Sequence, residues 1–278
     1  MKNILVIGLV GDSYFYECEQ LPTKGQTIQA HSLHTEIGGK GFNQAYTIYM
    51  LGGNVTFLTA LGNDEIGLKV QKEMNSLGVN TKVVIKDGTT PIASIITTKA
   101  GDNEVIVYPG VSLTIDDLKN NSNLLKEADI VLLQAELPAE VTNYLLDECY
   151  KLGKTIILNP APASTSIDIS KATYLIPNKI EAKMLFGENY ISALEKMKAV
   201  VTLGDDGALC FSEGKMHKIP AIKQNVLDST GAGDIFCGAC CFFLANGASL
   251  FEASQKANLY ASKSVTKKYV IDSIKSLV

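Results

Sequence analysis

The sequence predicts an α/β fold in which a central, mainly parallel β-sheet is flanked by helices, in three layers of the Rossmann type. Short apolar runs alternate with helical patterns, which is typical of βαβ units. Apolar residues make up 46% of the 278 residues and charged residues only 19%, so the chain can fill a large core. Extended patterns at about 12–37 and 83–108 interrupt this rhythm and predict a small antiparallel β lid. We therefore expect a single domain, 1–278, that carries this lid.

The expected strands of the main sheet are short and rich in β-branched or other apolar residues, as buried parallel strands are. They are residues 4–8, 55–61, 130–133, 155–158, 174–176 and 200–203. Helical patterns lie between and after them, at 43–51, 138–152, about 234–246 and about 249–267. The lid is expected to use 27–37 together with 83–85, 92–98 and 104–107, and turn signals separate the last three runs at 87–88 and 101–103.

The charge of the chain excludes some classes of partner. The formal net charge is −4, which argues against a nucleic-acid-binding protein because such proteins need a basic face. All 25 basic residues are lysines. Without arginine, a bound phosphate must be held by lysine, by backbone N–H groups or by a metal ion.

The six cysteines and the N-terminus predict a cytoplasmic protein with free thiols. The apolar run after Lys2 ends at Asp12, too early for a signal peptide. The longest apolar run, 235–245, is far shorter than the roughly 18 residues that a membrane span needs. The spacing of Cys237, Cys240 and Cys241 resembles a metal or redox motif, but on a helix these small residues are expected to lie in the core.

Directly before one expected helix, the chain reads DSTGAGD at 228–234. A glycine-rich turn at the start of a helix presents unpaired backbone N–H groups and the positive end of the helix dipole, which suits a phosphate or a developing oxyanion. Asp234 stands at the edge of this turn, where a carboxylate can accept a proton from a hydroxyl group. Glycine and aspartate are also ordinary capping residues, so a shorter string would indicate only a helix cap.

A second glycine-rich string, GGKGFNQA at 38–45, also leads into a helix. It is not a P-loop, because no serine or threonine follows Lys40. Its glycines allow a ligand to approach the backbone, and Lys40 and Asn43 offer donors to sugar-like hydroxyls. Taken alone, the string is equally consistent with a turn and a helix cap.

Together the two strings resemble the signatures of the ribokinase-like, or pfkB-type, family of carbohydrate kinases, with ribokinases as the closest branch. Further strings match the family in its order over nearly the whole chain, at 22–25, 134–136, 159–163, 177–181 and 202–204. The resemblance implies a kinase that transfers the γ-phosphoryl group of ATP to a hydroxyl of a small sugar, such as ribose or a related pentose or hexose. It also implies that the lid covers the sugar and often serves as a dimer clasp.

The resemblance further implies a role for each matching residue. Asp234 matches the catalytic base, with an anion hole at Gly231, Ala232 and Gly233. The residues that match sugar contacts are Gly39, Lys40, Asn43 and Glu136. The residues that match nucleotide contacts are Asn178, Thr202, Gly204, Gly207 and Asn258. Glu181 matches the carboxylate that holds Mg²⁺ through water, and one carboxylate plus phosphate oxygens suits that ion.

The sequence departs from the family at the sugar pocket. Ribokinases carry an N-x-D string after the first strand, and its aspartate grips two sugar hydroxyls. Counting from Gly8 or back from Pro22 places Ser13 at that position and Asp12 one residue earlier. A one-residue bulge would bring Asp12 to the sugar; the alternative is a loop aspartate that caps a turn. Ribose is therefore one candidate substrate among several.

A second departure concerns potassium. Asp228 and Thr230 match half of the family's monovalent-cation loop. The other half usually includes a glycine, whereas this chain reads KKYVIDS at 267–273. K⁺ therefore stays open as a cofactor beside ATP and Mg²⁺.

The lid strands also predict a homodimer. Bare edges of a small sheet promote aggregation. Apolar residues occupy more than one register of the lid, namely Ile92, Ile95, Ile96, Val105 and Val107. Two lids that clasp each other about a two-fold axis would bury them. The alternative is a monomer whose lid packs onto its own main sheet.

Other functions remain open at this point. Within the kinase family, the alternative is a nucleoside or pseudouridine kinase. A nicotinamide-dependent oxidoreductase is suggested by GLVG at 8–11, but this string lacks the G-x-G-x-x-G spacing. A sugar-binding relic without turnover is the third alternative, and Asp234, Asn178 and Glu181 argue against it.

Overall fold

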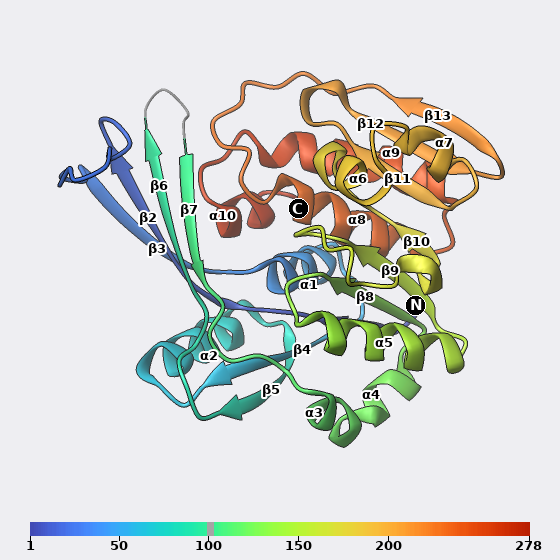
Figure 1. Ribbon diagram of the computed structural model, residues 1–278, viewed down its shortest axis with the longest axis horizontal. Coiled ribbons are helices and arrows are strands. Elements are labelled where there is room, and N and C mark those ends of the chain that lie inside the picture. Colours follow the sequence, from blue (N-terminus) through green and yellow to red (C-terminus); the bar gives the residue numbers. More distant parts are fainter. Residues whose placement is uncertain (99–102) are drawn as a thin grey trace.

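A nine-stranded sheet forms the centre of the protein, and its strands run in parallel except at one edge (Figure 1). The structure is a computed structural model and describes residues 1–98 and 103–278. In spatial order the strands are β13 (Lys215–Ile219), β12 (Ala208–Ser212), β11 (Ala199–Thr202), β10 (Tyr174–Leu175), β9 (Thr155–Asn159), β8 (Ile130–Gln134), β1 (Ile4–Ile7), β4 (Val55–Gly62) and β5 (Asn80–Lys86). The six strands predicted for this sheet are confirmed to within one residue at each end. The antiparallel pair β12–β13 was not predicted.

Helices cover both faces of this sheet, as the alternation of side chains along β1 illustrates. Ile4 and Val6 pack on one face and Leu5 and Ile7 on the other. The first face is covered by α1 (Lys40–Met50), α2 (Glu65–Leu77), α8 (Ala232–Ala245), α9 (Leu250–Ser264) and α10 (Val270–Lys275). The second is covered by α3 (Ile115–Asn120), α4 (Ser122–Glu127), α5 (Ala139–Lys151), α6 (Lys179–Phe186) and α7 (Tyr190–Leu194). Short 3₁₀ turns occur at Ile169–Lys171 and Gly204–Asp206. In the part of the chain described, no helix combines the length and the apolar character needed to cross a bilayer.

A second, four-stranded sheet projects from the body and forms the lid (Figure 1). Its strands, in spatial order, are β3 (Ser32–Gly38), β2 (Gly11–Cys18), β6 (Ile92–Thr98) and β7 (Asn103–Tyr108). The two outer pairs are antiparallel, and the central pair β2–β6 is parallel. The predicted lid is confirmed, although β2 was not predicted as a strand and the run expected from residue 27 begins only at Ser32.

One lid assignment was wrong. The run 83–85 belongs to β5, which pairs in parallel with β4 at the edge of the main sheet. The reason is that α2 carries the chain back over the sheet, so this run continues a βαβ unit and does not start a hairpin. The turn signal at 87–88 therefore connects the two sheets. Of the signal at 101–103, residues 101 and 102 lie outside the described part.

The root of the lid is fixed to α2 by two carboxylates. Asp12 of β2 is fully buried, and both of its oxygens accept hydrogen bonds from Nζ of Lys69 at 2.8 Å. Asp64, the N-cap residue of α2, accepts hydrogen bonds from the amide of Thr90 (2.9 Å) and from its hydroxyl (2.6 Å), just before β6. These bonds lower the pKa of Asp64. Both strands that lead into the lid are thus held by one helix.

The cysteines are buried free thiols, as predicted. Cys237, Cys240 and Cys241 lie on α8 within the core, at no more than 2% exposure. Burial raises the pKa of Cys240 to about 12, so its thiol stays protonated and unreactive. The interpretation of these residues as core packing is confirmed.

Candidate active site

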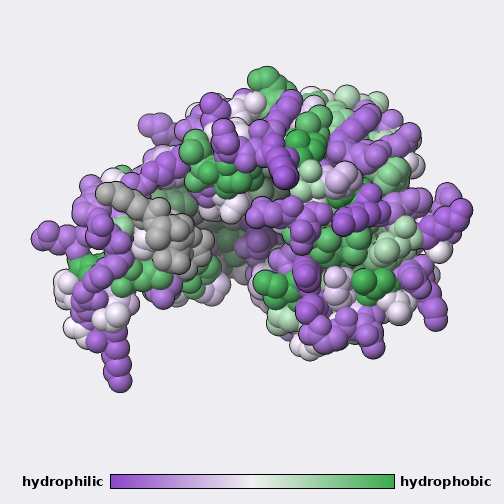
Figure 2. Space-filling model, turned by 90° about the horizontal axis from the view of Figure 1, so that it is seen from above, coloured by the Kyte–Doolittle hydropathy of each residue, from purple (hydrophilic) through white to green (hydrophobic). Residues whose placement is uncertain are grey.

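A polar cavity of about 110 Å³ opens at the carboxyl ends of the parallel strands. Loops and helix starts from both halves of the chain meet there, as is usual for ligand sites in such sheets. Seven of the residues singled out from the sequence line it: Lys40, Asn178, Glu181, Thr202, Gly231, Gly233 and Asp234. Asn159, Ala161, Ile176 and Cys237 complete the lining. Seen from above, the surface is hollowed between the lobe that carries the lid and the larger body (Figure 2).

Asp234, in the first turn of α8, is the best-positioned carboxylate of this cavity. It is 7% exposed, and its oxygens accept hydrogen bonds from Nδ2 of Asn43 (3.0 Å) and Nε2 of Gln44 (3.1 Å), both on α1. The Oδ1 atom of Asn43 is buried and has no hydrogen-bond partner among the described residues. The cavity therefore offers an oriented carboxylate that can accept a proton from a substrate hydroxyl, whereas Asn43 itself does not line the cavity.

A chain of buried amides supports Asp234 and was not identified from the sequence. Nε2 of Gln44 also donates to Oδ1 of Asn159 (3.1 Å), and its Oε1 accepts from Nε2 of Gln134 (2.7 Å). Asn159 in turn donates to the carbonyl oxygen of Ile176 (2.8 Å). Gln134 and Asn159 end neighbouring parallel strands. Their common position at the carboxyl edge of the sheet was the feature of the sequence that could have predicted their contact. The network fixes the rotamer of Gln44 and hence the direction of Asp234.

The glycine-rich turn before α8 has the geometry of an anion-binding site. Gly231 has φ of +76°, which favours glycine, and it is the N-cap of α8. The amide of Ala232 donates to the carbonyl oxygen of Ser229 (3.2 Å). The amides of Gly233 and Asp234 lie in the first helical turn, where no intrahelical acceptor is available. The predicted anion hole is thus placed beside the carboxylate of Asp234.

Lys40 begins α1 and supplies positive charge to the cavity. Gly39, with φ of +113°, turns the chain so that the amide of Lys40 donates to Oε2 of Glu136 (3.0 Å). The carboxylate of Asp234 raises the pKa of Lys40, and Glu136 and Glu181 add to this effect. Lys40 therefore stays charged and offsets part of the negative charge of Asp234, Glu136 and Glu181. Burial raises the pKa of Glu136 to about 7, against the opposing effect of Lys40.

The raised pKa of Glu136 predicts a pH-dependent stability. Its pKa is 4.5 ordinarily and about 7 in the folded protein, so the folded state holds the extra proton between these values. The free energy of unfolding should therefore fall as the pH rises from about 4.5 to about 7. With partial exposure allowed for, we expect the free energy of unfolding to fall by about 2 kcal/mol over this pH range. Glu136→Gln should remove this fall. Chemical denaturation at several pH values measures it.

The exposed Glu140, in the first turn of α5, provides the control for this measurement. Glu140→Gln should keep the wild-type slope. Equal slopes in wild type and Glu136→Gln would show that the carboxyl group of Glu136 titrates normally.

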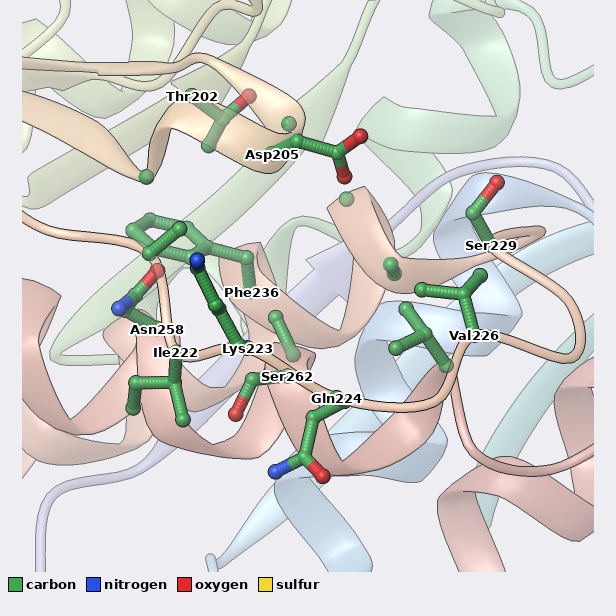
Figure 3. A pocket seen from close by; sticks show the side chains of 17 residues that line it. Thr202, Asp205, Ile222, Lys223, Gln224, Val226, Ser229, Phe236, Asn258 and Ser262 are labelled. Carbon is green, nitrogen blue, oxygen red and sulfur yellow. The ribbon is translucent and has the colours of Figure 1, made fainter.

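A larger pocket, of about 460 Å³, adjoins the first one and shares Thr202 and Gly233 with it (Figure 3). Figure 3 shows Ile222, Phe236 and Val226 among its apolar lining and Asp205 at its rim. Gly204, Gly207 and Asn258 also line it. A flat apolar pocket that opens onto an anion hole fits a nucleotide whose base lies in the larger pocket and whose phosphates reach Gly233.

Asn258 has a structural contact that the sequence did not reveal. Its Nδ2 donates to the carbonyl oxygen of Pro220 (3.0 Å), so it fixes the segment 220–224 that walls the nucleotide pocket. Gly207, with φ of +89°, approaches the same segment, because a Cβ atom there would come within 2.1 Å of the carbonyl oxygen of Ile219. Both residues shape the wall of the pocket as well as lining it.

Asn178 and Glu181 form a reciprocal capping box at the start of α6. Glu181 accepts from the amide of Asn178 (2.8 Å) and from its Nδ2 (2.8 Å), and the amide of Glu181 donates to Oδ1 of Asn178 (2.9 Å). Burial raises the pKa of Glu181, and the amide of Asn178 and Lys40 oppose this. Within the described residues, no three His, Cys, Asp or Glu side chains are grouped to hold a metal ion. The donor set fits Mg²⁺ held mainly by phosphate oxygens and water, with one carboxylate nearby.

Gly39, Asn43, Glu136 and Thr230 do not line the small cavity, and three further residues considered from the sequence also lie outside it. Asp12 is bonded to Lys69 and is not among the residues that line the cavity. Ser13, the neighbour of Asp12, lies against Gly38: a Cβ atom on Gly38 would come within 2.6 Å of Oγ of Ser13. Asp228 accepts hydrogen bonds from the amide of Thr230 (2.8 Å) and from the amide of Tyr269 (3.3 Å), so backbone groups already use both of its oxygens.

Comparison with known proteins gives a consistent result. The family description "pfkB family carbohydrate kinase" matches residues 1–277. The chain is 34% identical to the ribokinase of Bacillus subtilis over 277 residues, which cover 95% of this chain and 93% of the relative. It also resembles the crystal structure of ribokinase from Thermotoga maritima, with a TM-score of 0.86 and 30% identity over 100% of this chain and 98% of the other. The structure of Arabidopsis thaliana ribokinase complexed with ribose and ATP matches with a TM-score of 0.85 and 27% identity, over 99% and 97% of the two chains.

Proposed function

This chain belongs to the pfkB family of carbohydrate kinases, and from this premise we propose that it phosphorylates a hydroxyl group of ribose or a closely related pentose with ATP. The observation that carries the proposal is the position of Asp234. Its carboxylate is held by Asn43 and Gln44, and it stands between the anion-binding turn and the small polar cavity. The nucleotide pocket shares Gly233 with that cavity, so a γ-phosphate placed at the turn is within reach of a sugar hydroxyl.

The proposed reaction uses each group in one role. Asp234 accepts the proton of the attacking hydroxyl, and the amide N–H groups of Asn43 and Gln44 hold its carboxylate in position. The amides of Gly233 and Asp234 and the charge of Lys40 stabilise the transferred phosphoryl group. Mg²⁺, when bound with the nucleotide, neutralises phosphate charge, and Glu181 is the residue that would hold it through water. Lys40 takes the place of an arginine, which this chain lacks.

The choice of a pentose follows from the relatives. The B. subtilis relative is named a ribokinase. A nucleoside kinase of the same fold is the second candidate. We do not include K⁺ in the proposal, because residues 267–273 lack the glycine that the family's cation loop usually includes.

A coupled assay of ADP formation tests the proposed function. The enzyme is supplied with Mg²⁺, ATP and one of a series of pentoses, hexoses and nucleosides. We expect turnover to be fastest with ribose or another pentose, and to be abolished by EDTA. Fastest turnover with a nucleoside would favour the second candidate, and no turnover with any acceptor would contradict kinase activity.

We further propose that the protein is a homodimer joined through its lids. The edge strand β7 carries exposed apolar residues on both of its faces: Val105 (54%), Ile106 (68%), Val107 (59%) and Tyr108 (55%). A free strand edge with such residues favours pairing with another chain. A second copy provides the same strand and closes the pair about a two-fold axis.

Light scattering at micromolar concentration tests the dimer. We expect twice the chain mass of 29.9 kDa. Ile106→Glu should shift the mass to a single chain, whereas Leu68→Glu, at an exposed apolar position on α2, should leave it unchanged. A wild-type mass of 29.9 kDa with full activity would contradict the proposal.

A further inference from the structure

A buried carboxylate links the lid to the C-terminal part of the chain. Glu36 of β3 is 7% exposed, and it accepts hydrogen bonds from the backbone amides of Val270 (2.9 Å) and Ile271 (3.2 Å). Such charge-assisted bonds are short and strong, and a buried carboxylate that loses them is costly. The lid therefore fixes the position of two backbone amides at the start of α10.

The residue before them is held by lid side chains as well. Tyr269 has φ of +68°, a backbone conformation that residues other than glycine rarely adopt. Its ring stacks on His34 of β3 with 3.6 Å between centroids, and it contacts Phe15 of β2 edge-on at 5.6 Å. Contacts with two lid strands thus maintain a strained backbone at Tyr269.

Tyr269 and Val270 also contact the turn before α8. The amide of Tyr269 donates to Asp228 (3.3 Å), which accepts from the amide of Thr230 as well (2.8 Å). Val270 packs against Gly231, since a Cβ atom on that glycine would come within 2.6 Å of Cγ1 of Val270. A continuous set of contacts therefore runs from Glu36 to the anion-binding turn.

We propose that Glu36 is a positioning residue for phosphoryl transfer. From the lid it holds residues 269–271, and these hold Asp228 and Gly231, so that the amides of the anion-binding turn keep their direction. Because hydrogen-bond donors stabilise a transition state only when they are aimed in advance, a small displacement of this turn lowers the rate. This inference rests on the proposed kinase function, and it assigns to the lid an effect on the phosphate end of the site.

Steady-state kinetics of two variants test the proposal. Glu36→Gln keeps the size and one acceptor and should lower kcat about fivefold; Glu36→Ala should lower it about twentyfold. The KM for the sugar and the Kd for the nucleotide should change less than about twofold, because the turn acts on the transition state. Glu17→Gln is the matched control: Glu17 also lies on the lid and pairs with Lys268, but this pair is partly exposed, so kcat should not change.

Two further measurements separate positioning from a general loss of structure. In a Tyr269→Gly background the Glu36→Gln change should cost clearly less than in wild type, because both act through one path. Hydrogen exchange of the amides at 228–233 should be faster in Glu36→Gln than in wild type, and unchanged in Glu17→Gln.

Hydrogen exchange does not depend on catalysis, so the two proposals fail separately. If wild type phosphorylates no acceptor, the proposed function is wrong, and exchange at 228–233 still decides the link to Glu36. Unchanged kcat and unchanged exchange in Glu36→Gln, or an equal drop of kcat in Glu17→Gln, would overturn the positioning role.

Discussion

Asp234→Asn is expected to lower kcat by at least about a hundredfold, because the attacking hydroxyl loses its proton acceptor. The variant keeps the shape of the side chain. Its amide N–H₂ group would face Asn43 or Gln44, which both donate to the native carboxylate, so one hydrogen bond is replaced by two donors that face each other. The nucleotide should bind as before, because Asp234 does not line the larger pocket that we propose for its base. Steady-state kinetics and equilibrium titration of the nucleotide measure the two effects separately.

Asp116→Asn is the matched control, since Asp116 is an exposed carboxylate in the first turn of another helix, α3. It should turn over at the wild-type rate. Near wild-type turnover of Asp234→Asn would remove Asp234 from the role of base and leave it a helix-capping residue.

Lys40→Met is expected to have the second-largest effect, a fall in kcat of roughly a hundredfold. Methionine keeps most of the length and removes the charge that opposes Asp234, Glu136 and Glu181. The phosphoryl group would then meet carboxylates without the neighbouring cation. Lys40→Arg should not restore the rate, because a planar guanidinium is not equivalent to an ammonium group in a cavity of about 110 Å³.

Lys179→Met provides the comparison, because Lys179 is an exposed lysine at the start of α6, beside the site but outside its lining. It should leave kcat unchanged. If Lys179→Met and Lys40→Met had equal effects, the loss would reflect the overall charge around the site and not a specific contact of Lys40.

The parts of the fold and site that were predictable are those encoded within short strings. Buried parallel strands have an apolar pattern of their own, and DSTGAGD combines a turn, a helix start and a carboxylate within seven residues. Both were placed correctly. The run 83–85 was misassigned because its pattern fits an edge strand of either sheet, and only the crossover through α2 decides between them.

Contacts between distant residues were not predictable from one sequence. Gln44 and Gln134 are 90 positions apart, and Glu36 and Val270 are 234 apart. Nothing in their local patterns indicates a partner. Asp12 illustrates the same limit: nothing in its local pattern indicated its bond with Lys69, 57 residues away.

The two carboxylates at the root of the lid determine where that sheet can bend. Asp12 and Asp64 tie the beginnings of β2 and β6 to the N-terminal half of the same helix, so the root cannot act as a free hinge. A sheet clamped at its base behaves as a cantilever: displacement is smallest near the clamp and grows toward the free end. The base of the lid is therefore its stiffest part, and we expect any motion of the lid to be distributed along its outer strands while the geometry at its base is kept.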